Sequence, residues 1–173
     1  MGCGHNKEIL MKKYLYFWGH QTSKSYIGKE CLSQWYPSSF EVDGVQYYNC
    51  EQYMMAEKAK LFGDEDALKS ILKSRDPKSV KSIGRTVENF DAKLWDENKF
   101  DIVVKGNYNK FSQDELLKDY LLSTGDKILV EASPYDTVWG VGLRASDPLI
   151  LNESTWKGLN LLGEALMKVR NEI

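Results

Sequence analysis

Two ionisable residues in segment 49–62, "NCEQYMMAEKAKLF", are spaced for chemistry. Glu51 and Lys58 lie seven positions apart, about two helical turns, on the same side as Met54 and Met55. If that side faces a cavity, the helix start favours an ionised Glu51, which suits a base or a charge stabiliser better than an acid. Partial burial beside the methionines would lower the pKa of Lys58 and make it a nucleophilic amine.

Both residues also have a purely structural interpretation. A carboxylate in the first turn of a helix, such as Glu51, complements the helix dipole without doing chemistry. A lysine such as Lys58 can lay its aliphatic stem over an apolar face and keep its amine in water. The segment alone leaves both interpretations open.

A second candidate is segment 133–142, "SPYDTVWGVG", which has the composition of a loop. Gly140 and Gly142 permit close backbone approach or positive φ. In such a loop Asp136 could bind a sugar hydroxyl and Trp139 could stack on a base. The alternative is a tight turn whose tryptophan fills the core.

Segment 69–85 is strongly basic and contains a single acid, Asp76. Its basic residues are Lys69, Lys73, Arg75, Lys78, Lys81 and Arg85. Such a run is typical of a solvated helix face. Arg85 differs from the others because it follows Gly84 at the predicted end of a helix, where a fixed guanidinium could bind phosphate.

Several kinds of site are missing from the sequence. It has no Walker motif, no GxGxxG and no metal-ligand spacing, so we expect neither a metal nor a cofactor. With His5 in a leader segment, His20 is the one imidazole of the predicted domain, which argues against a histidine-based triad. Any chemistry must therefore rely on carboxylates and lysine.

Composition indicates a cytoplasmic globular protein. The chain has 173 residues, a net charge of −2, 42% hydrophobic and 28% charged residues. Three cysteines, Cys3, Cys31 and Cys50, are an odd number and favour a reducing compartment. No signal peptide or membrane-spanning run is present. We expect a flexible leader over 1–13 and a single domain over 14–173.

Local patterns predict a mainly helical α+β fold with a small antiparallel β element. The expected strands and turns are a strand at 14–19, a hairpin at 40–47 around Asp-Gly, and a strand at 127–132. The expected helices start at Asn49, after Asp64, at Asp76, at Asp91, after a capping box at 112–115, and at about residue 158. Gly106 is a weak point of the fourth helix.

Five stretches together resemble one known family. They are "SSFEVDGVQYYNCEQYMMAEKAKLF", "IGRTVENFDAKLW", "KFSQ", "LVEASPYDTVWGVG" and "GLNLLGEALMKVR", in this order, and they span about residues 16 to 172. The resemblance is to the NADAR or YbiA-like family. Two positions depart from its usual pattern, because Gln34 stands where Asn is common and Cys50 stands where Ser is usual.

The resemblance implies a mainly helical fold and an N-glycosidase. Some family members hydrolyse phosphoribosylamino-pyrimidine intermediates of riboflavin biosynthesis. Others remove ADP-ribose from guanine in DNA or RNA, in some cases as antitoxins to a cognate ADP-ribosyltransferase toxin. The implied ligand is thus ADP-ribose or a ribose phosphate. By position, the resemblance implies active-site roles for Glu51, Lys58, Asp136 and Trp139, and pocket-lining or supporting roles for Gly84, Arg85, Trp95, Gly140 and Asn160.

These substrates share a ribose C1 joined to an exocyclic amine. Such a sugar can open to an imine, which suggests that Lys58 forms a Schiff base at C1 while Glu51 moves protons. Direct hydrolysis, with Glu51 and Asp136 as a carboxylate pair, is the alternative. A third hypothesis is a non-catalytic module that binds ADP-ribose or NAD, although binding alone does not require the two acids and the lysine.

Overall fold

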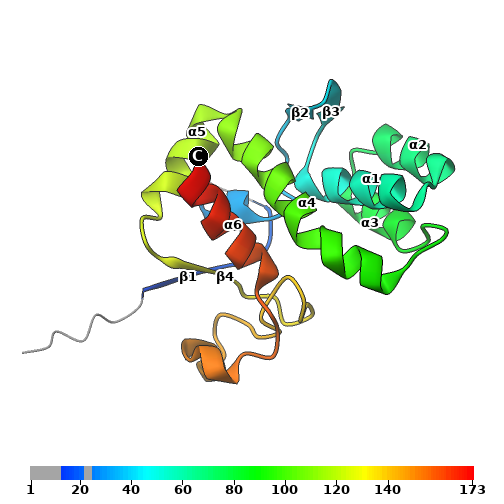
Figure 1. Cartoon of the computed structure of the whole chain (residues 1–173). Helices are drawn as coiled ribbons and strands as arrows, with labels where there is room; N and C mark the ends of the chain where they lie inside the picture. Colours follow the sequence, from blue (N-terminus) through cyan, green and yellow to red (C-terminus); the bar gives the residue numbers. More distant parts are fainter. Residues whose placement is uncertain (1–12, 22–24) are drawn as a thin grey trace, which may run out of the picture.

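The computed structural model describes residues 13–21 and 25–173, which form six α-helices, four short strands and three 3-10 helices (Figure 1). The α-helices are α1 (Cys50–Phe62), α2 (Glu65–Lys73), α3 (Pro77–Gly84), α4 (Ala92–Ser112), α5 (Glu115–Ser123) and α6 (Leu161–Glu172). The strands are β1 (Tyr14–Phe17), β2 (Phe40–Val42), β3 (Val45–Tyr47) and β4 (Ile128–Glu131). The 3-10 helices are η1 (Lys29–Leu32), η2 (Pro148–Leu151) and η3 (Glu153–Thr155).

The predicted fold class is confirmed. The Asp-Gly hairpin is present as the antiparallel pair β2–β3, with positive φ at Asp43 and Gly44. A second sheet, which the sequence did not predict, pairs β1 with β4 in parallel, from Tyr14 opposite Ile128 to Phe17 opposite Glu131. Because the partners are far apart in sequence, no local pattern indicates this pairing.

Most helix starts follow from their capping residues. The Asn49 side chain accepts a hydrogen bond from the Gln52 backbone N–H at 2.8 Å, and Gln52 Oε1 accepts one from the Tyr48 N–H at 2.8 Å. This is the predicted capping-box pattern, with its return bond one residue earlier. Asp76 caps α3 as predicted, and Asp91, where the fourth helix was expected to start, caps α4; each side chain accepts from the N–H three residues on.

Two predicted helix starts were wrong. The predicted capping box began at Ser112, but Ser112 ends α4 and its hydroxyl donates back to the Asn109 carbonyl; Asp114 caps α5 instead. The last helix begins at Leu161, because Asn160 has a left-handed backbone with φ 53°. Gly106 does not interrupt α4. A Cβ there would lie 2.6 Å from a ring carbon of Tyr53, so glycine allows α1 and α4 to approach closely.

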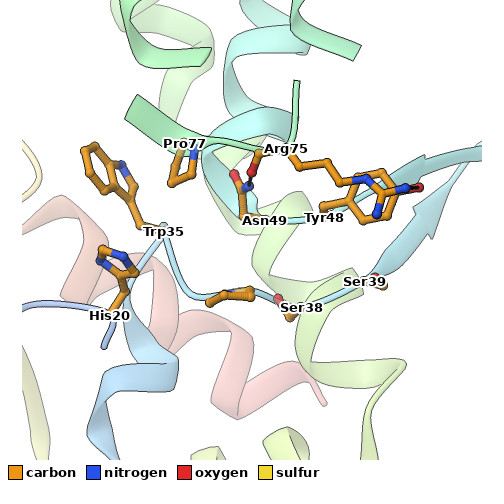
Figure 2. Close-up of a pocket in the computed structure, with 9 residues that line it drawn as sticks. His20, Trp35, Ser38, Ser39, Tyr48, Asn49, Arg75 and Pro77 are labelled. Atoms are coloured by element: carbon orange, nitrogen blue, oxygen red, sulfur yellow. Dashed lines mark hydrogen bonds between the residues drawn. The ribbon is translucent and has the colours of Figure 1, made fainter. Parts of the chain in front are cut away.

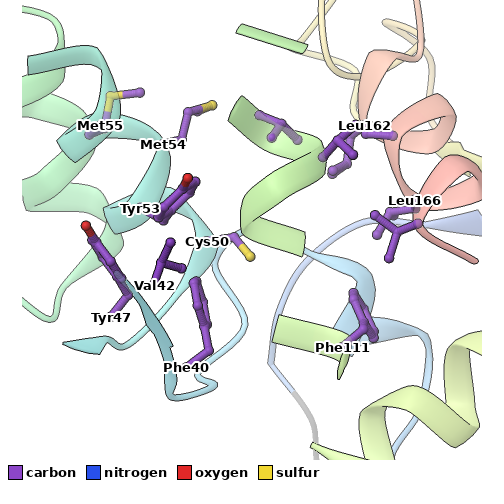
Figure 3. Packing of buried hydrophobic residues seen from close by; sticks show 14 of the residues in the cluster. Phe40, Val42, Tyr47, Cys50, Tyr53, Met54, Met55, Phe111, Leu162 and Leu166 are labelled. Carbon is purple, nitrogen blue, oxygen red and sulfur yellow. The ribbon is translucent and has the colours of Figure 1, made fainter. Parts of the chain in front are cut away.

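Helix α4 is the centre of the molecule. In Figure 1 it runs between the α1–α3 group on one side and α6 on the other, and it contacts both α1 and α6. The main core lies along these contacts: Figure 3 shows side chains of α1 and the hairpin on one side of α4, and Leu162 and Leu166 of α6 on the other. Strand β4 of the β1–β4 pair packs against α6.

The other predictions concern the leader, the cysteines and membrane-spanning segments, and part of the leader and one cysteine lie outside the described residues. The predicted leader, 1–13, lies outside the described residues except for Lys13. Cys31 and Cys50 are buried and free, while Cys3 lies outside the described part of the chain. No helix among residues 13–21 and 25–173 is both long and apolar enough to cross a bilayer.

Candidate active site

Glu51 is buried in the first turn of α1. Its side chain is 4% exposed, its backbone N–H donates to the Gln34 carbonyl at 3.1 Å, and its carboxylate accepts a hydrogen bond from the Trp35 side chain. The segment that carries Gln34 and Trp35 is held by Lys110, whose buried Nζ donates to the carbonyls of Cys31 and Ser33. Contacts from distant parts of the sequence therefore fix the carboxylate.

Burial raises the pKa of Glu51 to about 7. The charge of Lys81 opposes this rise, and so do the hydrogen bond from Trp35 and the charge of Arg85. The charge of Asp136 adds to the rise. The prediction that Glu51 stays ionised was therefore wrong, since desolvation outweighs the helix start at this position. Near neutral pH this carboxyl can either donate or accept a proton.

Lys58 lies two turns further along α1, half-buried among aromatic rings. Its Nζ donates to the Gly84 carbonyl at 2.8 Å and lies 4.7 Å from the centre of the Phe90 ring and 5.5 Å from that of Trp95. Burial lowers the pKa of Lys58, and the charge of Glu51 opposes this shift. The predicted direction is confirmed, although the amine contacts a carbonyl and rings rather than methionines.

Gly84 is required by the packing around it. A Cβ at Gly84 would lie 1.9 Å from the sulfur of Met55, so no side chain fits between α3 and α1. The close approach brings the Gly84 carbonyl within reach of Lys58. Arg85, the next residue, is exposed and its charge acts on Glu51.

Asp136 and Trp139 share one tight turn in the predicted loop. Asp136 Oδ1 accepts hydrogen bonds from the backbone N–H groups of Val138 and Trp139, at 2.9 and 2.8 Å. A Cβ at Gly140 would lie 3.0 Å from the Asp136 carbonyl oxygen, so the turn needs glycine there. The Trp139 ring is half-buried against the main core, which agrees with the structural alternative for this residue.

Asn160 supports the site through hydrogen bonds to the backbone of β4. Its Oδ1 accepts from the Glu131 N–H at 3.0 Å and its Nδ2 donates to the Leu129 carbonyl at 2.9 Å, so it ties the start of α6 to β4. Asn160 is fully buried. It therefore positions the end of β4 and does not line an open surface.

Glu131 is a site residue that the sequence reasoning missed. It ends β4, and its Oε2 is buried without a hydrogen-bond partner among the described residues. Burial raises its pKa to about 8; the charges of Asp136 and Glu51 add to the rise and that of Lys81 opposes it. The available signal was an acid at the end of an apolar strand, directly before the loop that carries Asp136.

Lys81 and Trp35 were missed as well. Lys81 belongs to the basic run that was interpreted as a solvated face, which holds for the exposed Lys69 and Lys73. Lys81 is instead half-buried, with Nζ 5.9 Å from the centre of the Trp35 ring. It is the cation with the largest effect on the pKa of Glu51.

The two departures from the family pattern meet at one buried side chain. Asn107 Nδ2 donates to Gln34 Oε1 at 2.7 Å, and Cys50 Sγ donates to Asn107 Oδ1 at 3.6 Å. The Cys50 thiol takes no part in capping α1, because Asn49 caps the helix. Gln34 and Cys50 thus act together in supporting the start of α1.

The structure brings the three acids Glu51, Glu131 and Asp136 into one electrostatic cluster with Lys81, and places Lys58 within the influence of Glu51. No group of three or more potential ligands in the described part of the chain could hold a metal ion. Because the pKa values of Glu51 and Glu131 are raised to near neutrality, the cluster can exchange protons there. Lys58 supplies an amine with a lowered pKa.

Residues 16–173 match the family model of the NADAR domain. The chain belongs to the NADAR family. Among its NADAR relatives, N-glycosidase R617 of Acanthamoeba polyphaga mimivirus is 46% identical over 165 residues, which cover 92% of this chain and 96% of the viral protein. The chain is accordingly an N-glycosidase, a hydrolase of N-glycosyl bonds.

Two further relatives bear on the NADAR fold and its uses. The NMR structure of the Escherichia coli protein YbiA superposes with a TM-score of 0.75 at 25% identity, covering 97% of this chain and 89% of YbiA. The riboflavin biosynthesis protein PYRR of Zea mays is 31% identical over 131 residues, which cover 73% of this chain and 19% of the maize protein.

The raised pKa values predict how stability depends on pH. Both folded-state pKa values lie above the ordinary 4.5 of glutamate, so ionisation of Glu51 and Glu131 destabilises the fold as pH rises from about 4.5 through 7 and 8. We expect Glu51→Gln and Glu131→Gln to increase the free energy of unfolding by about 1–3 kcal/mol near pH 9 and to leave it unchanged near pH 4.

Denaturant unfolding at the two pH values would test this expectation, with the exposed Glu97→Gln as the matched control. A variant that is destabilised near pH 9 would contradict the account of the buried carboxyls.

Proposed function

We propose that this NADAR protein removes ADP-ribose from guanine bases in nucleic acid by cleaving the bond between ribose C1 and the exocyclic amine. The observation that carries the proposal is an amine of lowered pKa, Lys58, under the influence of a carboxyl that can change protonation near neutral pH, Glu51. A glycosylamine is the kind of substrate on which such a pair can act, because its ring-opened form is an imine.

The first steps of the proposed mechanism transfer the sugar to the enzyme. The unprotonated Lys58 amine adds to C1 of the ring-opened imine. The bond between C1 and the base nitrogen then breaks, and that nitrogen takes a proton as the base leaves. The resulting Schiff base between Lys58 and the ribose is hydrolysed by water, which frees ADP-ribose and restores the amine.

The carboxyl cluster supplies the protons for these steps. The leaving nitrogen needs a donor, and Glu131, with a pKa of about 8, is protonated at neutral pH. Glu51, with a pKa of about 7, can take the proton that Lys58 loses and can stabilise the cationic imine. We assign ribose hydroxyls or the attacking water to Asp136.

Binding roles complete the assignment. The exposed Arg85 is placed to meet a phosphate, and the exposed part of the Trp139 ring is available to stack on a base. Trp95 contributes through its contact with Lys58, where its ring faces the amine.

A second candidate substrate is a phosphoribosylamino-pyrimidine, and the maize relative named for riboflavin biosynthesis supports it. That relative contains the matching unit as a fifth of a longer chain, whereas the viral N-glycosidase matches along almost its whole length. The full-length match supports an N-glycosidase that acts as a single unit, and we propose the ADP-ribosylated base as its substrate. A non-catalytic ADP-ribose module would leave the buried acids and the amine without a use.

Substrate preference tests the proposal directly. We expect kcat/KM for ADP-ribosylguanine in a single-stranded oligonucleotide to exceed that for the phosphoribosylamino-pyrimidine by at least about tenfold. Release of ADP-ribose or ribose 5-phosphate, followed by chromatography, gives both rates. Activity on the polymer should also fall steeply with salt. Preference for the pyrimidine would overturn the proposed substrate.

Substitution of the amine separates the two mechanisms. Lys58→Arg keeps the positive charge but removes the nucleophile, so we expect turnover to fall by about 10³-fold or more if the route is covalent. Glu51→Gln should reduce turnover by about 10²–10⁴-fold in either mechanism. Lys60→Arg, on the same helix, is the matched control. Near-normal turnover of Lys58→Arg would instead indicate direct hydrolysis by Glu51 and Asp136.

A further inference from the structure

A cavity of about 390 Å³ lies beside the candidate active site, and among its lining residues only Trp35 was placed in that site above (Figure 2). Its size falls within the range of small-ligand pockets, roughly 300–1,000 Å³. Residues from four distant segments line it, among them His20, Trp35, Tyr48, Arg75 and Pro77.

One wall of the cavity is aromatic. The rings of His20 and Trp35 are 5.6 Å apart and tilted by 58°, and Figure 2 shows them together on one side of the pocket. Trp35 also hydrogen-bonds to Glu51, and Lys81 lies over its ring. The same indole thus borders both the cavity and the carboxyl cluster, so a ligand in the cavity lies next to the reaction centre.

The opposite wall carries a guanidinium in a fixed position. Arg75 lies over the ring of Tyr48, with Cζ 3.8 Å from the ring centre, and its Nη2 donates to the Tyr48 hydroxyl at 2.9 Å (Figure 2). The Arg75 carbonyl accepts from Asn49 Nδ2 at 3.1 Å, which ties this residue to the cap of α1. A guanidinium held in this way binds phosphate without first losing side-chain freedom.

We infer that this cavity is a nucleotide subsite, in which a base packs against Trp35 and His20 and a phosphate binds Arg75. The inference rests on the proposed function, because that substrate contains nucleotides beyond the reacting ribose. The chemistry, an aromatic base joined to a phosphate, has two sources. One is the adenosine end of ADP-ribose, and the other is the nucleotide next to the modified guanine.

Binding of 5′-AMP to the full chain, measured by calorimetry, tests the subsite. We expect Arg75→Gln to weaken 5′-AMP binding by about tenfold and adenosine binding by much less, because only 5′-AMP has a phosphate. Lys73→Gln removes the same charge from an exposed position outside the cavity and should have little effect. Equal 5′-AMP affinity in all three proteins, or no binding to the wild type, would overturn the inference.

Competition then identifies the source of the nucleotide. If 5′-AMP displaces ADP-ribose, the subsite takes the adenosine end. If both bind together, and Arg75→Gln weakens binding of a short single-stranded oligodeoxynucleotide but not of ADP-ribose, the subsite takes the flanking nucleotide. Either result supports the subsite.

A parallel assay of wild-type turnover on ADP-ribosylguanine keeps the two proposals apart. Turnover without Arg75-sensitive 5′-AMP binding overturns the subsite alone. Arg75-sensitive binding without turnover overturns the proposed function and leaves a nucleotide site.

Discussion

Removal of the Glu51 carboxyl from water is the constraint on which the rest of the site depends. A buried carboxylate is costly unless it is paired, and this one lies near two other acids, Glu131 and Asp136. Lys81, Arg85 and the Trp35 hydrogen bond offset only part of that cost, so the pKa stays raised. The fold thereby keeps these carboxyl groups partly protonated near neutral pH, as the proposed proton transfer to a leaving base requires.

The architecture around Glu51 serves to hold this unfavourable arrangement in place. Lys110 fixes the segment that carries Trp35, and Asn160 fixes the end of β4 from which Glu131 extends. The two supports act on different sides of the cluster and come from α4 and from the start of α6. The core packed around α4 provides the rigidity that is needed to keep these acids buried close to one another.

Local features of the fold could be predicted from the sequence, because caps and turns depend on residues a few positions apart. Asn49, Asp76 and the Asp-Gly turn are examples. The parallel pairing of β1 with β4, which brings Glu131 into the site, depends on distant segments and has no local signal. For the same reason the helix that carries Glu51 was predicted correctly, because a helix start depends on neighbouring residues. The pKa of Glu51 was not, because its burial depends on distant segments.

In the proposed mechanism Lys58 forms a covalent bond with the ribose. The most direct measurement is the intact mass of the protein after incubation with ADP-ribose and sodium cyanoborohydride, which reduces a Schiff base to a stable amine. We expect one ADP-ribose adduct on the wild type, mapped to Lys58 by peptide analysis and absent from Lys58→Ala. An adduct that persists in Lys58→Ala, or a wild type that forms none, would contradict this mechanism.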